Sequence, residues 1–437
     1  MLETLKLWLN SQLKSHHKLL VAYSGGKDSH VLLDALVTLK STYGYVLEAI
    51  HINHGLQSIS PQMKAHCAFI CENYHIPLHL VDLSLQILPG ESLEEKARLY
   101  RYRAMKNFVD ENTLLLTAHT QGDQAETFLL QLIRGSGVKG LACIAPMKAF
   151  GNGYIARPLL SVSKASIHDY ASLKKLNWIE DPSNQNLQLR RNFIRNEILK
   201  PLEKVHPNSS KCIARSAKHC QETMVILNEY VSQDVALCQG EKPHTLKLNA
   251  LQMLSQQKQA WVLRHWLSEQ KATLPSLQKC SQMLKQMLHA KTDAQPLICW
   301  GTWQLRRYQG HIYFLTQQSV DSTLQYEWDI SSPITLADGR KWQLKATMGA
   351  GFAKSKLQEN VIQVAYRQGG ERCYLGDKHS SKSLKKVFQQ LSIPPWERAL
   401  VPLFYHHDSL IGVGRLFISP QWEVTSEHEE GFVFESL

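Results

Sequence analysis

Residues 24–29 read Ser-Gly-Gly-Lys-Asp-Ser and place two glycines beside hydroxyl, ammonium and carboxylate groups. Gly25 and Gly26 let backbone amides approach a ligand at little conformational cost. The apolar run 19–23 precedes this string and a helical pattern follows it, so the string leads into a helix N-terminus, which favours an anion. Asp28 would repel a bare phosphate, and a bridging Mg²⁺ explains its presence. We therefore predict a nucleotide phosphate site; the alternative is a surface turn that caps a helix.

A second set of candidate site residues consists of carboxylates and histidines. Asp123 and Glu126 are three residues apart in a helical pattern, so they share one helix face. The alternative for this pair is a solvated acidic first turn, which helices favour anyway. His51 and His54 lie at the end of a predicted strand, and His119 follows another. We reject a zinc site for these histidines because neither C-x-x-C nor H-E-x-x-H occurs.

Strand and helix signals alternate in the first half of the chain. Short apolar runs predict strands at 19–23, 46–52, 78–83 and 113–118. Helical patterns occur between and after them, at 29–40, 61–74, 91–110 and 123–133. This alternation predicts a doubly wound, mostly parallel, Rossmann-like α/β sheet. Ligands of such sheets bind beyond the carboxyl ends of the strands, where the polar residues above fall.

The rest of the chain changes character. We expect the first domain to span 1–208, followed by a mainly helical domain at 209–345 with trailing strands and a C-terminal α+β domain at 358–437. The chain has 437 residues, which is enough for several cores. No apolar run approaches the roughly 18 residues of a membrane span. The nine scattered cysteines lack C-x-x-C spacing and favour reduced thiols in the cytoplasm.

Positive charge is concentrated in two tracts. The formal net charge is +11 with a pI near 9.1, so a polyanion such as nucleic acid is the expected partner. Residues 185–221 carry eight Lys or Arg against two Glu, and residues 367–398 carry seven Lys or Arg against three acidic residues. An extended polyanion is able to contact both tracts.

Residues 24–29 match the SGGxDS loop of the PP-loop, or N-type ATP pyrophosphatase, family. Further strings resemble one branch of it, the tRNA(Ile)-lysidine synthetases. These strings are HINHGL at 51–56, GESLEEKARLYRYRAM at 90–105, GDQAETFLLQLIRGSG at 122–137, RPLL at 157–160, Trp178 with EDPSN at 180–184, RRNFIR at 190–195, and the tail that begins RQGGERCYLG at 367. The resemblance touches most of the chain in order.

This resemblance implies an adenine nucleotide hydrolase-like fold and an ATP- and Mg²⁺-dependent ligase. ATP would adenylate O2 of the wobble cytidine in the CAU anticodon of tRNA(Ile), and the side-chain amine of lysine would displace AMP, which changes codon reading from AUG to AUA. The implied catalytic residues are Asp28, Asp123 and Glu126, with Asp28 also holding the metal. The implied nucleotide ligands are Ser24, Gly25, Gly26, Lys27, Asp28, Ser29, His51 and Asn53. The expected tRNA contacts are Arg98, Arg101, Arg191, Arg195, Lys385 and Lys386. The sequence leaves open whether the chain is a monomer or a homodimer.

Three positions depart from the usual pattern of that branch. Thr120 replaces the second histidine of AHHxDDQAET, Gly122 replaces its first aspartate, and Gln57 replaces the arginine that often closes HxNHGLR. Roles carried by these positions are therefore in doubt. Two other functions stay open: a PP-loop tRNA thiolase, for which Cys67 and Cys71 are the closest cysteine pair, and a tRNA-binding protein without turnover.

Overall fold

The computed structural model describes residues 1–13, 18–53, 55, 59–83, 93–291, 294–317, 321, 323–357, 360–374 and 381–437. They form two compact units, Met1–Glu229 and Tyr230–Leu437. Among the described residues, no helix combines the length and the apolar composition that crossing a membrane requires.

A six-stranded sheet lies at the centre of the first unit, in the order β3-β2-β1-β4-β6-β5. The strands are β1 (Lys18–Ala22), β2 (Val46–Asn53), β3 (Leu78–Asp82), β4 (Thr113–Leu116), β5 (Met147–Phe150) and β6 (Gly153–Ala156). Every neighbouring pair is parallel except β5 with β6. The chain moves outward from β1 through β2 to β3 and then returns to β4 on the other side of β1, so the strand order reverses between β1 and β4. The predicted mostly parallel sheet is confirmed.

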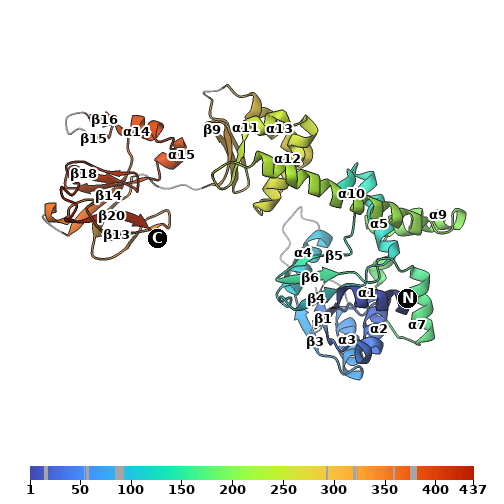
Figure 1. Cartoon of the computed structure of the whole chain (residues 1–437). Helices are drawn as coiled ribbons and strands as arrows, with labels where there is room; N and C mark the ends of the chain where they lie inside the picture. The colour runs from blue at the N-terminus through green and yellow to red at the C-terminus, as the bar shows by residue number, and fades with distance from the viewer. Residues whose placement is uncertain are drawn as a thin grey trace. The chain divides into compact units, whose positions relative to one another are not determined.

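Helices cover both faces of this sheet (Figure 1). They are α1 (Leu2–Gln12), α2 (Lys27–Tyr43), α3 (Ser60–Asn73), α4 (Leu93–Lys106), α5 (Gln121–Ile133) and α7 (Lys164–Leu173). Side chains of the central strands alternate between two cores: Leu19 and Val21 pack with α1, α2, α3 and α7, whereas Leu20 packs with Met105 of α4. This period of two is what a sheet buried on both faces requires.

The segment that follows α7 packs against α5. It contains the 3₁₀ turn Pro182–Gln185, α8 (Arg190–Phe193), a π-helical turn (Ile194–Leu199), α9 (Lys200–Val205) and α10 (Ser209–Cys238), while α6 (Val138–Leu141) follows α5. Ile194 and Leu199 of the π-helical turn pack against Ala125 of α5. Single π-helical turns are often found at functional sites, and this one carries Arg195 into the site described below.

The second unit begins within α10 and continues into a small helix-and-sheet segment. Its elements are β7 (Thr245–Lys247), α11 (Leu248–Met253), α12 (Gln256–Glu269), α13 (Leu277–His289), β8 (Leu297–Trp300), β9 (Trp303–Tyr308) and β10 (His311–Thr316), with the sheet order β7-β10-β9-β8. In the predicted helical domain, α11 and α12 are separate helices because Leu254 is extended and the Ser255 hydroxyl caps α12 by accepting the Lys258 N–H.

The C-terminal part of this unit packs two antiparallel sheets face to face. One has the order β11-β14-β17-β18-β19 and the other β12-β13-β20. Their strands are β11 (Gln325–Asp329), β12 (Ile334–Thr335), β13 (Lys341–Met348), β14 (Val361–Tyr366), β17 (Pro402–His406), β18 (Ser409–Val413), β19 (Phe417–Ile418) and β20 (Glu430–Ser436). Phe404 and Phe434 stack between the sheets with ring centroids 3.8 Å apart. The strands of 325–348 thus pair with strands after 360, across the interval where we expected a domain to end.

The remaining elements of the second unit are short turns, strands and helices outside these two sheets. They are a 3₁₀ turn at Lys354–Lys356, β15 (Arg372–Tyr374), β16 (Ser381–Ser383), α14 (Leu384–Gln390) and α15 (Pro395–Arg398). Leu384, Val387 and Phe388 of α14 are buried against Leu403 and Val413. This packing fixes the helix that carries Lys385 and Lys386.

Candidate active site

The loop between β1 and α2 is shaped by glycine and serine. Gly25 has φ +85°, and a Cβ there would lie 3.2 Å from Sγ of Cys67, so both conformation and space require glycine. The Ser29 hydroxyl donates to the Gly26 carbonyl at 2.9 Å and lies 3.0 Å from the Ser24 hydroxyl. Ser24 N–H in turn donates to Ser29 Oγ at 3.2 Å. The two serines therefore hold the loop in shape.

The helix that follows this loop begins without a side-chain cap. Gly26 is the N-cap residue of α2 and has no side chain to accept a first-turn amide. The unpaired first-turn amides and the helix dipole make this end an anion site. By contrast, α5 also begins at the carboxyl edge of the sheet, but a capping box between Thr120 and Asp123 occupies its first amides. Only one of these two helix ends is free to hold a phosphate.

A cavity of about 730 Å³ opens at this edge of the sheet, where β1, β2 and β4 end. It brings together most of the residues predicted from the sequence: Ser24, Gly26, Lys27, Asp28, Ser29, His51, Asn53, Arg101, Asp123 and Arg195. It also contains residues for which the sequence suggested no role, above all Lys164. Trp178 lines it as well, with its ring centroid 5.6 Å from Nζ of Lys27. The position matches the reversal of strand order, where ligands of open α/β sheets bind.

Asp28 is a half-buried carboxylate that forms no hydrogen bond or ion pair with another described residue. Burial raises its pKa, as does the neighbouring Asp123 carboxylate, while Lys164, Lys27 and Arg195 oppose the rise. No three His, Cys, Asp or Glu residues of the described part of the chain cluster as metal ligands. Mg²⁺, however, is commonly held by one or two carboxylates together with phosphate oxygens and water. The unpaired Asp28 fits that donor set.

Glu126 is the centre of an ionic cluster rather than an open carboxylate. Its side chain is only 1% exposed. Arg195 donates to both oxygens, from Nε at 2.6 Å and Nη2 at 2.9 Å, and Arg191 Nε donates at 2.8 Å. Lys164 Nζ adds a bond of 3.1 Å. Burial alone would raise the pKa of Glu126, but these cations lower it overall, so Glu126 stays ionised and is a poor proton acceptor.

Asp123 joins the cap of α5 to the same cluster. Its Oδ2 accepts the Thr120 N–H at 2.8 Å and the Thr120 hydroxyl at 2.9 Å, while its Oδ1 accepts Arg191 Nη2 at 3.0 Å. Burial raises the pKa of Asp123, and Arg191 and Lys164 outweigh this effect. Thr120, one of the three unusual positions, thus has a structural role at the start of α5.

Two histidines at strand ends are held neutral. Burial lowers the pKa of His119 to about 4, and its Nδ1 lies 2.8 Å from the Thr117 hydroxyl. His51 also has a pKa lowered by burial, and its Nδ1 lies 2.9 Å from the Tyr23 carbonyl, which fixes the proton on that nitrogen. Both rings therefore offer uncharged polar edges to the cavity.

Asn53 is engaged at both ends of its amide group. Its Nδ2 donates to Asp82 at 2.7 Å, and its Oδ1 accepts the Gly55 N–H at 3.0 Å. This arrangement shapes the turn that follows β2. The neighbouring motif positions His54 and Gln57 lie outside the described residues.

The arginines of α4 approach the cavity from the other face of the sheet. Arg101 lines it, whereas Arg98 is exposed and lies 5.1 Å from the Tyr102 ring centroid. Burial lowers the pKa of Arg101, as do Arg98 and Arg191 nearby. An anion would stabilise these mutually repelling arginines.

The cysteine pair expected of a thiolase is buried beneath the loop. Cys67 lies 3.3 Å from Nδ1 of His51, and burial raises its pKa well above the usual range. Burial likewise raises the pKa of Cys71 to about 12. All nine cysteines are free thiols. Since the thiolate is the reactive form, Cys67 and Cys71 are suited to packing rather than sulfur transfer.

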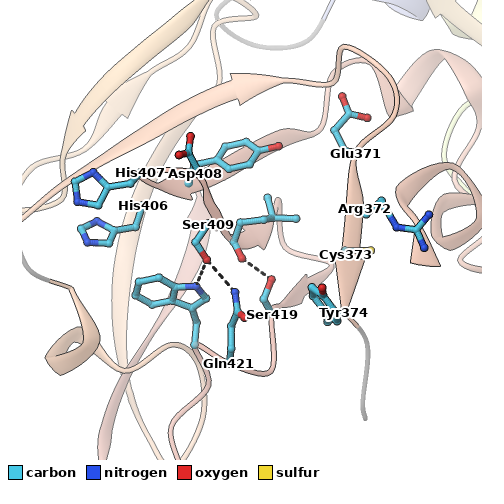
Figure 2. Close-up of a pocket in the computed structure, with 13 residues that line it drawn as sticks. Glu371, Arg372, Cys373, Tyr374, His406, His407, Asp408, Ser409, Ser419 and Gln421 are labelled. Carbon is cyan, nitrogen blue, oxygen red and sulfur yellow. Dashed lines mark hydrogen bonds between the residues drawn. The ribbon is translucent and has the colours of Figure 1, made fainter. Parts of the chain in front are cut away.

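The second unit has its own cavity, of about 720 Å³, between β15, β17 and β18 (Figure 2). Ser409 accepts Trp422 Nε1 at 3.0 Å and Gln421 Nε2 at 2.8 Å, and the Ser419 hydroxyl donates to the Leu410 carbonyl at 2.6 Å. These hydrogen bonds hold the lining residues of β18 and the segment 419–422 together. Lys385 and Lys386 are not among its lining residues.

Comparison with known proteins identifies the family. Residues 2–202 match the model of a PP-loop domain, residues 246–313 a TilS substrate binding domain, and residues 362–434 a TilS substrate C-terminal domain. The tRNA(Ile)-lysidine synthase of Coxiella burnetii is 37% identical over 417 residues, which cover 95% of this chain and 92% of that protein. The chain belongs to the tRNA(Ile)-lysidine synthase family.

Other members of the tRNA(Ile)-lysidine synthase family align equally fully. The Proteus mirabilis enzyme is 33% identical and covers 96% of this chain and 95% of its own length. Among solved structures, the U34-tRNA thiolase NcsA from Methanococcus maripaludis is 21% identical, covers 50% of this chain and 78% of that chain, and has a TM-score of 0.44.

Proposed function

We propose that this chain joins lysine to the wobble cytidine of the CAU anticodon of tRNA(Ile) and uses ATP to do so. In the first step, O2 of cytosine attacks the α-phosphorus of ATP and pyrophosphate leaves. In the second, the side-chain amine of lysine bonds to C2 and loses a proton, and AMP leaves with the former O2. The modified tRNA then reads AUA in place of AUG.

The uncapped N-terminus of α2 carries this proposal. It is the free helix end in the cavity, and its amides suit the pyrophosphate part of ATP. Lys27 and the loop serines would bind the same phosphates, and Asp28 would hold Mg²⁺. When bound, that ion would neutralise charge on the phosphates. His51 and Asn53 at the end of β2 would face the adenosine side of the nucleotide.

The carboxylates divide between two roles. Asp123 lines the cavity and would face the incoming lysine ammonium or the cytidine amino group. Glu126 is enclosed by cations, so we assign it as a positioning residue that orients Arg191 and Arg195 toward the tRNA backbone. An ammonium has no lone pair, so it must lose its proton before attack. The cationic side chains around the cavity favour that loss, because like charges lower the pKa of an amine.

Binding of the tRNA body would involve both basic tracts. Arg101 and Arg195 line the cavity, Arg98 is on the same helix as Arg101, and Arg191 is on α8; Lys385 and Lys386 lie on α14 in the second unit. Residues of the catalytic cavity all come from 22–200, so the proposal holds for a monomer and for a homodimer.

The test is transfer of radiolabelled lysine to unmodified tRNA(Ile) bearing CAU, with ATP and Mg²⁺. An elongator tRNA(Met) with the same anticodon is the matched control. We expect stable, ATP-dependent label on the isoleucine tRNA alone. Release of pyrophosphate without label would redirect the proposal to another nucleophile, and absence of both would leave a tRNA-binding protein without turnover.

A further inference from the structure

Lys164 has an unusual position for a lysine. It is the first residue of α7, whose start is fixed by Ser163 accepting the Ser166 N–H at 3.1 Å. The positive end of the helix dipole disfavours a cation there, and helices usually place acidic residues in their first turn. Two arginines already surround its partner, Glu126. Helix stability therefore does not account for a lysine at this position.

Gly122 makes the room that Lys164 occupies. A Cβ on Gly122 would lie 2.7 Å from Cε and 3.2 Å from Cδ of Lys164, so the flexible end of the lysine side chain would have to move away. Gly122 is in the first turn of α5, where glycine is a poor helix former. The missing side chain at Gly122 of α5 thus leaves space for the Lys164 side chain from α7.

The Lys164 ammonium keeps unused hydrogen-bonding capacity. An ammonium has three donors, and Lys164 forms one hydrogen bond to a described residue, to Oε1 of Glu126. That oxygen already accepts Arg195 Nε at 2.6 Å. The Lys164 side chain is 44% exposed, compared with 27% for Arg191 and 26% for Arg195, and it lines the cavity. It is the most accessible cation of the cluster around Glu126.

Lys164 lines the same cavity as the loop before α2 and the first turn of α5. Lys164 reaches α5 from α7, a helix that packs against α2. Asp28, Asp123 and Lys164 line the same cavity. A nucleotide whose terminal phosphates lie on the free end of α2 and whose reacting end points toward Asp123 would lie in the cavity that this ammonium lines.

We propose that Lys164 binds the α-phosphate of the nucleotide, and that Gly122 is the residue that admits it. This inference rests on the proposed function. During adenylation the ammonium would hold the α-phosphate of the adenylyl group that is transferred to O2 of cytosine. During amine attack the C2–O bond breaks, its electron pair goes to the leaving AMP, and the ammonium stabilises the added negative charge.

The experiment measures binding of AMP and, separately, of inorganic pyrophosphate to the full-length chain by titration calorimetry. The variants are Lys164→Met, Gly122→Ala and the control Lys174→Met, an exposed lysine at the other end of α7. We expect Lys164→Met to weaken AMP binding by about tenfold to a hundredfold, as loss of a charged hydrogen bond does, and to leave pyrophosphate affinity unchanged. Gly122→Ala should weaken AMP binding in the same way, because its methyl group displaces Lys164. It should not lower the melting temperature, because alanine favours the helix. Lys174→Met should match the wild type.

The result that overturns the inference is an unchanged AMP affinity in Lys164→Met, or an equal loss for AMP and pyrophosphate, which would mark a general charge effect. Absence of AMP binding by the wild type would also overturn it. Lysine transfer by the wild type is measured in parallel. A wild type that binds AMP through Lys164 but forms no lysidine would refute the proposed function and leave this inference standing.

Discussion

Replacing Glu126 by glutamine tests the view that this carboxylate holds the arginines in place. The amide keeps the shape of the side chain but removes the charge, and its NH₂ group would face the arginine N–H donors. Breaking a buried ion pair from one side costs about 3–5 kcal/mol. Because Arg191 keeps its bond to Asp123 and both arginines are about one-quarter exposed, we expect the lower end, ~3 kcal/mol. For a unit of 150–250 residues this corresponds to a fall in melting temperature of ~6–12 °C.

The pH dependence of this loss is a second signature. The pKa of Glu126 is lowered from its ordinary value of 4.5 in the folded protein, so its ionisation stabilises the fold fully above that value. The stabilisation is lost as the pH falls through the lower, folded pKa. The difference between wild type and Glu126→Gln should therefore be full at pH 7 and shrink below about pH 4.5.

Hydrogen exchange of α5 peptides in increasing urea measures this difference within the first unit. The control is Glu197→Gln, an exposed glutamate for which no ion pair is present among the described residues; it should change stability by less than about 0.5 kcal/mol. A loss below about 1 kcal/mol for Glu126→Gln, or a loss that does not depend on pH, would refute the assignment of Glu126 as the charge that holds the cluster together.

Three further changes test other parts of the site. Asp28→Asn should abolish pyrophosphate release while leaving tRNA binding largely intact. It should not lower stability at neutral pH, because burial raises the pKa of Asp28. The charged carboxylate therefore destabilises the fold once the pH exceeds the ordinary pKa of an aspartate. Unchanged turnover would exclude the metal role. Replacing Cys67 and Cys71 together by alanine should keep tRNA modification within about twofold, because both thiols remain protonated; loss of modification in a folded variant would revive sulfur transfer. Charge reversal at Lys385 and Lys386 should weaken tRNA binding and reduce the salt slope by about 1 per lost phosphate contact, and an unaltered slope in a filter-binding titration would remove α14 from the tRNA surface.

Local patterns were sufficient to predict the parallel sheet and the family. The apolar runs before residues 24, 53 and 119 end where polar residues begin, and the parallel direction of the strands then places those residues at one edge of the sheet. The short hairpin of β5 and β6 escaped prediction because Met147 and Lys148 are exposed and give no apolar run. The break between α11 and α12 was not predicted, because the residues on both sides of Ser255 have helical patterns and a single serine is compatible with one continuous helix.

The charge relations of the site could not be read from the sequence. Spacing showed that Asp123 and Glu126 share a face but not that Arg191 and Arg195 enclose Glu126 from a distant segment. Gly122 appeared only as a missing aspartate, and its relation to Lys164 depends on how α5 and α7 approach each other. Such contacts are set by tertiary packing, for which a single sequence has no local signal. The roles assigned to these residues stay predictions.

The Glu126 cluster also has a consequence for synthesis of the chain on the ribosome. The last strand of the first sheet ends at Ala156, whereas Arg191 and Arg195 are supplied about forty residues later. At ~5–20 residues per second, the nascent chain has a complete set of strands for ~2–8 s before the arginines exist. During that interval Glu126 lacks its arginine partners, and α5 lacks its packing against Ile194 and Leu199. Completion of the catalytic pocket is thereby delayed until the segment that connects to the second unit has begun to emerge, so that a truncated product ending before residue 190 would have the sheet without the assembled charges.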